Sequence, residues 1–176
     1  MRKAFFAALL LSFAVPASAA LPVGAPAPDF TTRGALAGKV FKLNLAEQLK
    51  KGPVVLYFFP AAFTPGCTLE AQEFAEATGE FRKLGATVIG MSADPIDKLA
   101  KFSVSECRSK FAVASAGRSL IDKYDVALPL KVGLSNRTSY VISPQGRIVY
   151  AHSDLSHRDH VKNTLAAVRK WRAEQK

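Results

Sequence analysis

The pattern of apolar and polar positions predicts a domain that mixes strands and helices. Two continuous apolar runs rich in β-forming residues, 54–59 and 86–91, have the character of strands buried on both faces of a sheet. Between them, apolar residues recur at spacings of three and four, which indicates one face of a helix. This stripe consists of Phe74, Ala77, Phe81 and Leu84.

The pattern predicts further strands and helices elsewhere in the chain. Residues 40–45 alternate as an edge strand or a hairpin arm does, and residues 138–142 and 148–150 flank the tight-turn sequence Ser-Pro-Gln-Gly, which predicts a hairpin. A second helix is expected to start at Pro95, with Asp94 as its N-cap.

The last segment predicts an amphipathic helix that opens on a capping-box-like pair, Ser156 and Asp159. Its apolar stripe consists of Val161, Leu165, Val168 and Trp171. The succession of strands and helices predicts an α/β domain, a central sheet with helices on both faces.

The N-terminus has the composition of an export signal. A short positive start precedes an apolar run over residues 4–15, and Ala-Ser-Ala at 17–19 places small residues where a signal peptidase requires them. We expect residues 1–19 to be removed, which leaves residues 20–176 as one domain in the periplasm or outside the cell. An N-terminal anchor helix is the alternative, but the apolar run is short for a membrane span.

Composition and charge narrow the possible functions. The chain has 176 residues, of which 49% are hydrophobic and 22% charged, as in an ordinary globular domain. The net charge of +10 becomes +8 when the two basic residues of the signal are lost (10 − 2 = 8). The basic residues are scattered, apart from a small cluster over 169–176, which is typical of a solvated surface. We therefore expect neither nucleic-acid binding nor stable membrane insertion.

The chain has only two cysteines, Cys67 and Cys107, which excludes a disulfide-dense scaffold. Cys67 follows Gly66 where a turn leads into the first predicted helix. Backbone N–H groups at a helix start lack partners, and the helix dipole is positive there, so both favour a thiolate. Position alone leaves two interpretations equally open, a reactive thiol and a small buried apolar side chain.

The residues around Cys67 resemble the active-site signature of peroxiredoxins. Residues 60–67, Pro-Ala-Ala-Phe-Thr-Pro-Gly-Cys, have Pro, Thr and Cys at the spacings of that family. The stretch Thr-Pro-Gly-Cys-Thr with Glu70 is similar to the Q-type, or bacterioferritin-comigratory-type, subgroup. Arg137 matches the arginine that the family places over the thiolate. The resemblance extends from about Pro26 to the terminal helix.

This resemblance implies a thioredoxin-like fold and the reduction of hydrogen peroxide or organic hydroperoxides by a cysteine. Cys67 would attack the peroxide as a thiolate and become a sulfenic acid. Thr64 would offer its hydroxyl to the peroxide, and Arg137 would donate hydrogen bonds to the thiolate. Pro60 would shield the sulfur from water, and Glu70 would hold the arginine in position. The polar residues also fit ordinary roles, as a turn hydroxyl, a surface charge and a first-turn carboxylate.

The second cysteine is where the resemblance is looser. Many Q-type members carry a partner cysteine five residues after the reactive one, but Gln72 occupies that position here. The resemblance then implies an intramolecular Cys67–Cys107 disulfide, formed after local unwinding. The alternatives are a one-cysteine peroxidase resolved by an external thiol and a non-catalytic exported protein with a structural disulfide. A thioredoxin-type disulfide oxidoreductase is disfavoured, because the chain has no Cys-x-x-Cys motif.

The sequence has no haem, metal, flavin or nucleotide motif, and the implied reaction needs no cofactor. It needs an electron donor, which we expect to be a thioredoxin-like protein, a glutaredoxin system or a low-molecular-weight thiol. His152, His157 and His160 are interpreted as surface residues, since no third ligand accompanies the neighbouring pair. We expect a monomer or a weak dimer.

Overall fold

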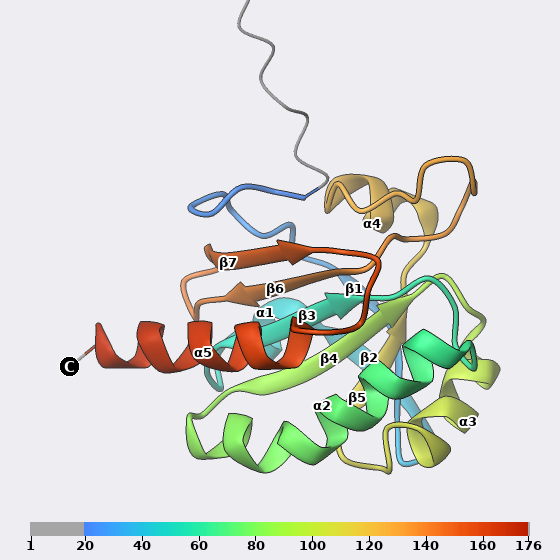
Figure 1. Cartoon of the computed structure of the whole chain (residues 1–176), viewed down its shortest axis with the longest axis horizontal. Helices are drawn as coiled ribbons and strands as arrows, with labels where there is room; N and C mark the ends of the chain where they lie inside the picture. The colour runs from blue at the N-terminus through green and yellow to red at the C-terminus, as the bar shows by residue number, and fades with distance from the viewer. Residues whose placement is uncertain (1–19, 176) are drawn as a thin grey trace, which may run out of the picture.

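The computed structural model describes residues 20–175, which form a seven-stranded mixed sheet with helices on both faces (Figure 1). The predicted export signal lies outside the described residues. The strands are β1 (Thr31–Leu36), β2 (Lys39–Asn44), β3 (Val54–Phe58), β4 (Thr87–Ser92), β5 (Ala112–Ser115), β6 (Thr138–Ile142) and β7 (Ile148–Ser153). The helices are α1 (Leu45–Leu49), α2 (Pro65–Lys83), α3 (Ile96–Ser105), α4 (Arg118–Lys123) and α5 (His160–Ala173).

The centre of the sheet is formed by the two apolar runs of the sequence. The strand order is β2-β1-β5-β4-β3-β6-β7, in which β3 pairs parallel with β4 and antiparallel with β6. Every residue of β3 is buried. A strand covered on both faces needs apolar side chains at successive positions, which explains its unbroken apolar sequence. The prediction of two buried strands is confirmed.

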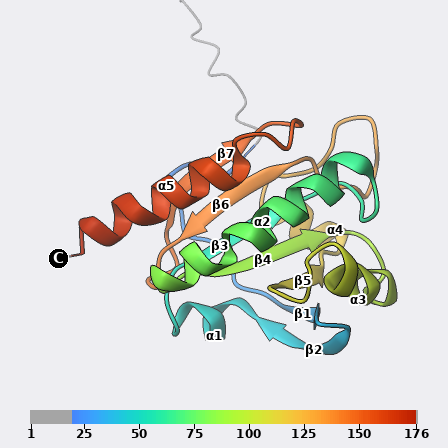
Figure 2. The same ribbon diagram turned by 60° about the horizontal axis from the view of Figure 1, so that its bottom comes forward.

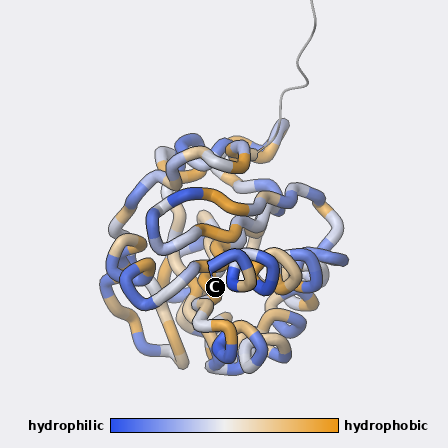
Figure 3. Tube along the Cα trace, turned by 90° about the vertical axis from the view of Figure 1, so that its left-hand side faces the viewer, coloured by the Kyte–Doolittle hydropathy of each residue, from blue (hydrophilic) through white to orange (hydrophobic). Residues whose placement is uncertain are grey.

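The pleat of β3 divides its side chains between two hydrophobic layers. Val55 and Tyr57 pack in one layer with residues of α2, α3 and α5, whereas Val54 and Phe58 pack in the other with residues of α1 and α4. Figure 2 shows α2 and α5 running side by side over the first layer. In the colouring of Figure 3, hydrophobic segments run through the interior and hydrophilic ones lie mainly outside. The predicted α/β architecture is confirmed.

Four short elements were not predicted, namely β1, β5, α1 and α4, which have between four and six residues each. Such lengths are too short for a hydrophobic period to stand out. They form because neighbours complete them: β1 lies between β2 and β5 and pairs with both. The predicted edge strand over 40–45 is observed as β2, at one edge of the sheet.

The predicted start of α3 is wrong by one residue. Pro95 is the N-cap, the helix begins at Ile96, and no side chain caps it. The Asp94 carboxylate instead accepts a hydrogen bond from the Ala62 backbone N–H at 2.7 Å and pairs with Lys98 Nζ at 2.7 Å. Asp94 therefore ties the loop that follows β3 to the start of α3.

The predicted capping box of α5 is also wrong. Asp159 is the N-cap, but its backbone is left-handed, with φ of 69°, and its side chain makes no capping hydrogen bond. A capping side chain needs an extended N-cap residue, so this geometry directs the carboxylate elsewhere. Ser156 Oγ accepts from the Arg158 backbone N–H at 3.3 Å.

A glycine in β4 gives a test of the packing around Tyr57. A Cβ at Gly90 would stand 2.8 Å from both Cζ and Oη of Tyr57, a ring that is fully buried. We expect Gly90→Ala to lower the free energy of unfolding by about 1–3 kcal/mol, because the ring must shift.

Gly79→Ala is the matched control, because a Cβ at this exposed position of α2 would meet nothing within 4 Å. It should raise the free energy of unfolding by up to about 1 kcal/mol, since alanine favours helix over glycine. Urea denaturation measures both values. Two variants of equal stability would contradict the proposed crowding at Gly90.

Candidate functional site

Cys67 lies in the first turn of α2, which follows β3 after the loop over residues 59–64. Pro65 occupies the first helical position, where its missing N–H removes no helical hydrogen bond. The loop between β3 and α2 is held by the Asp94–Ala62 hydrogen bond and contains Phe63 with a left-handed φ of 67°. The side chain of Cys67 is almost completely buried, with 2% of the residue exposed. The loop therefore delivers the sulfur to the positive end of α2, inside the protein.

Arg137, which directly precedes β6, holds the sulfur from the other side of the site. Its Nη2 lies 3.4 Å from Cys67 Sγ, its Nε donates to the Leu155 carbonyl at 2.9 Å, and its Nη1 forms an ion pair with Glu70 Oε2. A Cβ at residue 66 would stand 3.2 Å from Nη2, so Gly66 leaves room for the guanidinium. The guanidinium is thus held at three points.

The pairing of β3 with β6 brings these distant residues together. Phe58 at the end of β3 is the register partner of Thr138 at the start of β6. The residues that follow β3 and precede β6 consequently lie at the same edge of the sheet. Ser135 adds a hydrogen bond from its hydroxyl to the Phe59 carbonyl at 3.0 Å.

Thr64 and Pro60 lie on the loop beside this edge. Thr64 is exposed, and its hydroxyl donates to the Ala61 carbonyl at 2.9 Å. Because the hydroxyl proton is engaged, its oxygen keeps lone pairs that can accept a hydrogen bond from a bound molecule. Pro60 is half-buried and has no N–H to offer.

Glu70 is fully buried one turn after Cys67. Its Oε2 pairs with Arg137, whereas its Oε1 has no hydrogen-bond partner within the described part of the chain. That oxygen lies 3.7 Å from Nδ1 of His160. Burial raises the pKa of Glu70 to about 8, although the Arg137 guanidinium acts in the opposite direction.

The interpretation of His160 as a surface residue is wrong, because the structure buries it completely. Its Nε2 lies 3.0 Å from the Asp154 carbonyl, which can only accept, so Nε2 carries the proton. Its Nδ1 then accepts from the Ser139 hydroxyl at 2.8 Å. Burial lowers the pKa of His160 to about 4, which keeps the ring neutral at neutral pH. Sequence could not show this, because burial depends on how α5 packs on the sheet.

The other two histidines are partly exposed. The ring of His152 lies 4.6 Å from that of His160, and His157 Nδ1 lies 3.1 Å from Glu73 Oε1. No group of three or more His, Cys, Asp or Glu within residues 20–175 is placed to hold a metal ion.

Cys107 lies just after the end of α3 and is completely buried. Burial raises the pKa of its thiol. Both cysteines are free thiols, and both belong to the same hydrophobic cluster as Tyr57. Burial also raises the pKa of Tyr57, and charges on Cys107, Glu70 and Cys67 would raise it further. The Tyr57 ring therefore lies close to both cysteines.

The segment that carries Cys107 is strained and attached to α2 by polar contacts, among them a hydrogen bond of 2.8 Å from Arg82 Nη2 to the Lys110 carbonyl. Arg108 and Ser109 have left-handed backbones, with φ of 49° and 56°. Glu106 Oε2 accepts from Gln72 Nε2 at 2.9 Å, and Arg108 pairs with Glu76 at 3.1 Å. These contacts hold a conformation that the local backbone disfavours.

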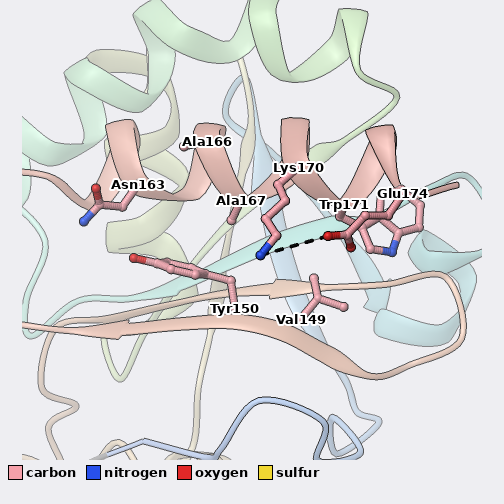
Figure 4. A pocket seen from close by; sticks show the side chains of 8 residues that line it. All are labelled: Val149, Tyr150, Asn163, Ala166, Ala167, Lys170, Trp171 and Glu174. Carbon is pink, nitrogen blue, oxygen red and sulfur yellow. Dashed lines mark ion pairs between the residues drawn. The ribbon is translucent and has the colours of Figure 1, made fainter.

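A cavity of about 410 Å³ lies away from these residues, between β7 and α5 (Figure 4). Tyr150 and Trp171 line it, and a Lys170–Glu174 ion pair of 4.0 Å lies beside them. Neither cysteine lines this cavity. Along the described chain, no helix is both long and apolar enough to cross a membrane.

Comparison with known proteins gives consistent matches. Residues 23–151 match the AhpC/TSA family. Peroxiredoxin Bcp of Bacillus subtilis is 29% identical over 154 residues, covering 85% of this chain and 96% of the relative. Peroxiredoxin Q of Oryza sativa subsp. japonica, a chloroplastic protein, is 32% identical over 143 residues, covering 81% of this chain and 64% of the relative.

A solved structure gives a similar result. The crystal structure of peroxidoxin BcpB from Mycobacterium tuberculosis superimposes with a TM-score of 0.75 and 32% identity, covering 84% of this chain and 96% of that one. The expected thioredoxin-like peroxiredoxin fold is confirmed.

The burial of His160 predicts a loss of stability in acid. Its pKa is about 4 in the folded protein and 6.5 without burial, so the unfolded chain binds more protons between these values. The stability contributed by the neutral ring is complete above about pH 6.5 and is lost as the pH falls towards about 4. We expect His160→Gln, which keeps a donor for the Asp154 carbonyl, to lose less free energy of unfolding over this range than the unmodified protein.

Urea denaturation at about pH 7 and about pH 4.5 measures the two losses. Glu70 changes stability in the opposite direction, since its raised pKa favours folding at low pH, but it is common to both proteins. Equal losses in the two proteins would show that His160 is not the group responsible.

Proposed function

The chain belongs to the AhpC/TSA family and is a thiol peroxidase, and from this premise we propose that Cys67 is the residue that reduces its hydroperoxide substrate. One observation carries the proposal: the Cys67 sulfur lies in the first turn of a helix, 3.4 Å from Nη2 of Arg137. The helix dipole and a fixed guanidinium both stabilise negative charge at this position. Family membership removes the non-catalytic alternative.

In the proposed reaction, the Cys67 thiolate attacks one peroxide oxygen. The S–O bond forms as the O–O bond breaks, water or an alcohol leaves, and the sulfur becomes a sulfenic acid. Arg137 stabilises the charge on the sulfur and on the separating oxygens, since its donors are already in position. The free lone pairs of the Thr64 hydroxyl accept a hydrogen bond from the peroxide O–H. Pro60 offers no N–H that would compete for the sulfur.

We propose hydrogen peroxide and small organic hydroperoxides as substrates. The sulfur is almost completely buried, and its polar contact is with the Arg137 guanidinium, which also pairs with Glu70. A small polar molecule that can hydrogen-bond to a guanidinium and a hydroxyl fits this chemistry. No cofactor is required, because the sulfur itself supplies the two electrons.

Cys107 is proposed to resolve the sulfenic acid as an intramolecular disulfide. Its complete burial prevents attack from the observed position, so the segment around it must open first. The consecutive left-handed residues Arg108 and Ser109 support such opening, since their strain is released on unfolding. Gln72, at the position of the missing short-range partner, instead holds this segment through Glu106.

The location of the protein limits which reductants it can meet. We propose that the export signal predicted from the sequence of residues 1–19 directs the chain to the periplasm. A thioredoxin-like protein, a glutaredoxin system or a low-molecular-weight thiol would then return the disulfide to thiols. The protein would act as a monomer or a weak dimer.

Replacement of each cysteine tests these roles. Cys67→Ser should abolish rapid peroxide consumption by the reduced protein, because no other thiolate is held at a helix start. Cys107→Ser should still consume one equivalent of peroxide, but it should not show the mass loss of two hydrogens that accompanies disulfide formation. Stopped-flow peroxide assays and intact-protein mass spectrometry measure these results.

Equal, slow consumption by Cys67→Ser and the unmodified protein would overturn the role of Cys67. Multiple turnover by Cys107→Ser at the unmodified rate would instead indicate resolution by an external thiol.

The contact between Gln72 and Glu106 gives a separate test of the opening step. Gln72→Ala removes one hydrogen bond that holds the Cys107 segment, a contact worth about 1 kcal/mol, so disulfide formation should accelerate about fivefold. The preceding oxidation of Cys67 should keep its rate.

Gln48→Ala is the control, because Gln48 on the unrelated helix α1 also contacts a charged side chain, Lys51, through a longer and exposed contact of 3.5 Å. It should leave both rates unchanged. A Gln72→Ala protein that forms the disulfide at the unmodified rate would show that this contact does not control opening.

A further inference from the structure

Two buried acids share one buried cation at this site. Cys67 and Glu70 both contact the Arg137 guanidinium, one through Nη2 and the other through Nη1. Among the described residues, Arg137 is the cation that acts on Glu70. His160 adds no charge, because its ring is neutral. If both acids were ionised, the buried group would carry a net charge of −1, whereas one proton on either acid restores neutrality.

The unpartnered oxygen of Glu70 indicates which acid carries that proton. As a carboxylate, Glu70 would leave Oε1 buried, charged and without a hydrogen bond. As a carboxylic acid, Glu70 buries the same oxygen without a charge, which costs less free energy. Nδ1 of His160 lies 3.7 Å from Oε1 but already accepts from the Ser139 hydroxyl, so the neutral ring gives that oxygen neither a hydrogen bond nor positive charge.

Further polar groups lie around Glu70 on α2 and on the neighbouring strands. Glu73, on the same helix, contributes negative charge. Tyr57 on β3 presents a neutral buried hydroxyl, and His152 on β7 packs its ring against that of His160. Of these groups, Glu73 favours a neutral Glu70 while Cys67 is an anion, and the uncharged Tyr57 does not oppose it.

Given the proposed role of Cys67, we propose that Glu70 holds a proton while Cys67 is a thiolate and releases it when Cys67 is oxidised. The step is Cys67-S⁻ + ROOH + Glu70-COOH → Cys67-SOH + ROH + Glu70-COO⁻. An S–O bond forms, the O–O bond breaks, and the sulfur gives two electrons to the peroxide. The leaving oxygen takes up one proton, and Glu70 releases one.

This exchange keeps the charge around Arg137 constant through the cycle. The guanidinium faces one anion before oxidation, on Cys67, and one afterwards, on Glu70. Condensation of the sulfenic acid with the Cys107 thiol releases only water. When a dithiol reduces the disulfide, Glu70 recovers its proton as the Cys67 thiolate forms again. No buried charge is left unpaired at any stage.

Infrared difference spectroscopy tests the protonation state directly. In a Cys107→Ser background, which stops the reaction at the sulfenic acid, we treat the reduced protein with one equivalent of hydrogen peroxide. We expect the C=O stretch of a protonated carboxyl group to disappear and a carboxylate band to appear. The carboxyl band should be missing in Glu70→Gln and retained in Glu80→Gln, an exposed position on the same helix.

A second measurement uses the protein with both cysteines present. A pH indicator in weakly buffered solution near neutrality reports protons taken up per Cys67 oxidised. We expect an uptake near zero, because Glu70 provides the proton, and an uptake near one in Glu70→Gln. An uptake near one in the unmodified protein, or a carboxyl band that oxidation does not change, would overturn the inference.

A thiol count after peroxide treatment separates this inference from the proposed function. If Cys67 is oxidised and the carboxyl band stays, only the role of Glu70 is overturned. If Cys67 is not oxidised at all, the proposed peroxidase role of Cys67 fails, and the inference fails with it.

Discussion

The contact between a buried guanidinium and a sulfur at a helix start organises the site of this protein. A buried cation is stable only beside compensating charge, and a buried anionic sulfur has the same requirement. Arg137 meets this requirement with two acids, Cys67 and Glu70, rather than one. The chemistry of the site follows from this sharing, because the charge on one acid determines the state that the other can adopt.

The fold holds this contact from several directions. The pairing of β3 with β6 brings Arg137 to the sheet edge where β3 ends, and the loop and helix start that follow β3 place Cys67 at the same edge. Packing of α5 against the sheet closes the site behind Glu70 and buries a neutral imidazole there. The loop after β7 adds the Leu155 carbonyl as a third partner of the guanidinium. A rigid, dry environment of this kind strengthens electrostatic stabilisation of a reacting thiolate.

Different interactions hold the second cysteine, Cys107, in its position. Its segment carries two successive left-handed residues and is held to α2 by side-chain contacts near the surface. Opening of this segment breaks these side-chain contacts, whereas opening around Arg137 would expose a buried ion pair. The proposed function thus combines a preorganised reacting group with a partner that would become accessible through local unfolding. In this proposal, the segment that opens around Cys107 is separate from the residues around Arg137 that must stay in position.

The sequence alone determined the local features of this protein. The apolar runs predicted β3 and β4, and the turn before Cys67 predicted that this cysteine stands at the start of α2. Both features depend on residues that are neighbours along the chain, so a local pattern is enough to indicate them. The signature over residues 60–67 and Arg137 indicated the family. Tertiary structure decided the rest. Arg137 reaches a cysteine 70 positions away only because β6 pairs with β3. The burial of His160 and the contact of Gln72 with Glu106 depend on how the helices pack, and helix packing cannot be predicted from a local sequence pattern.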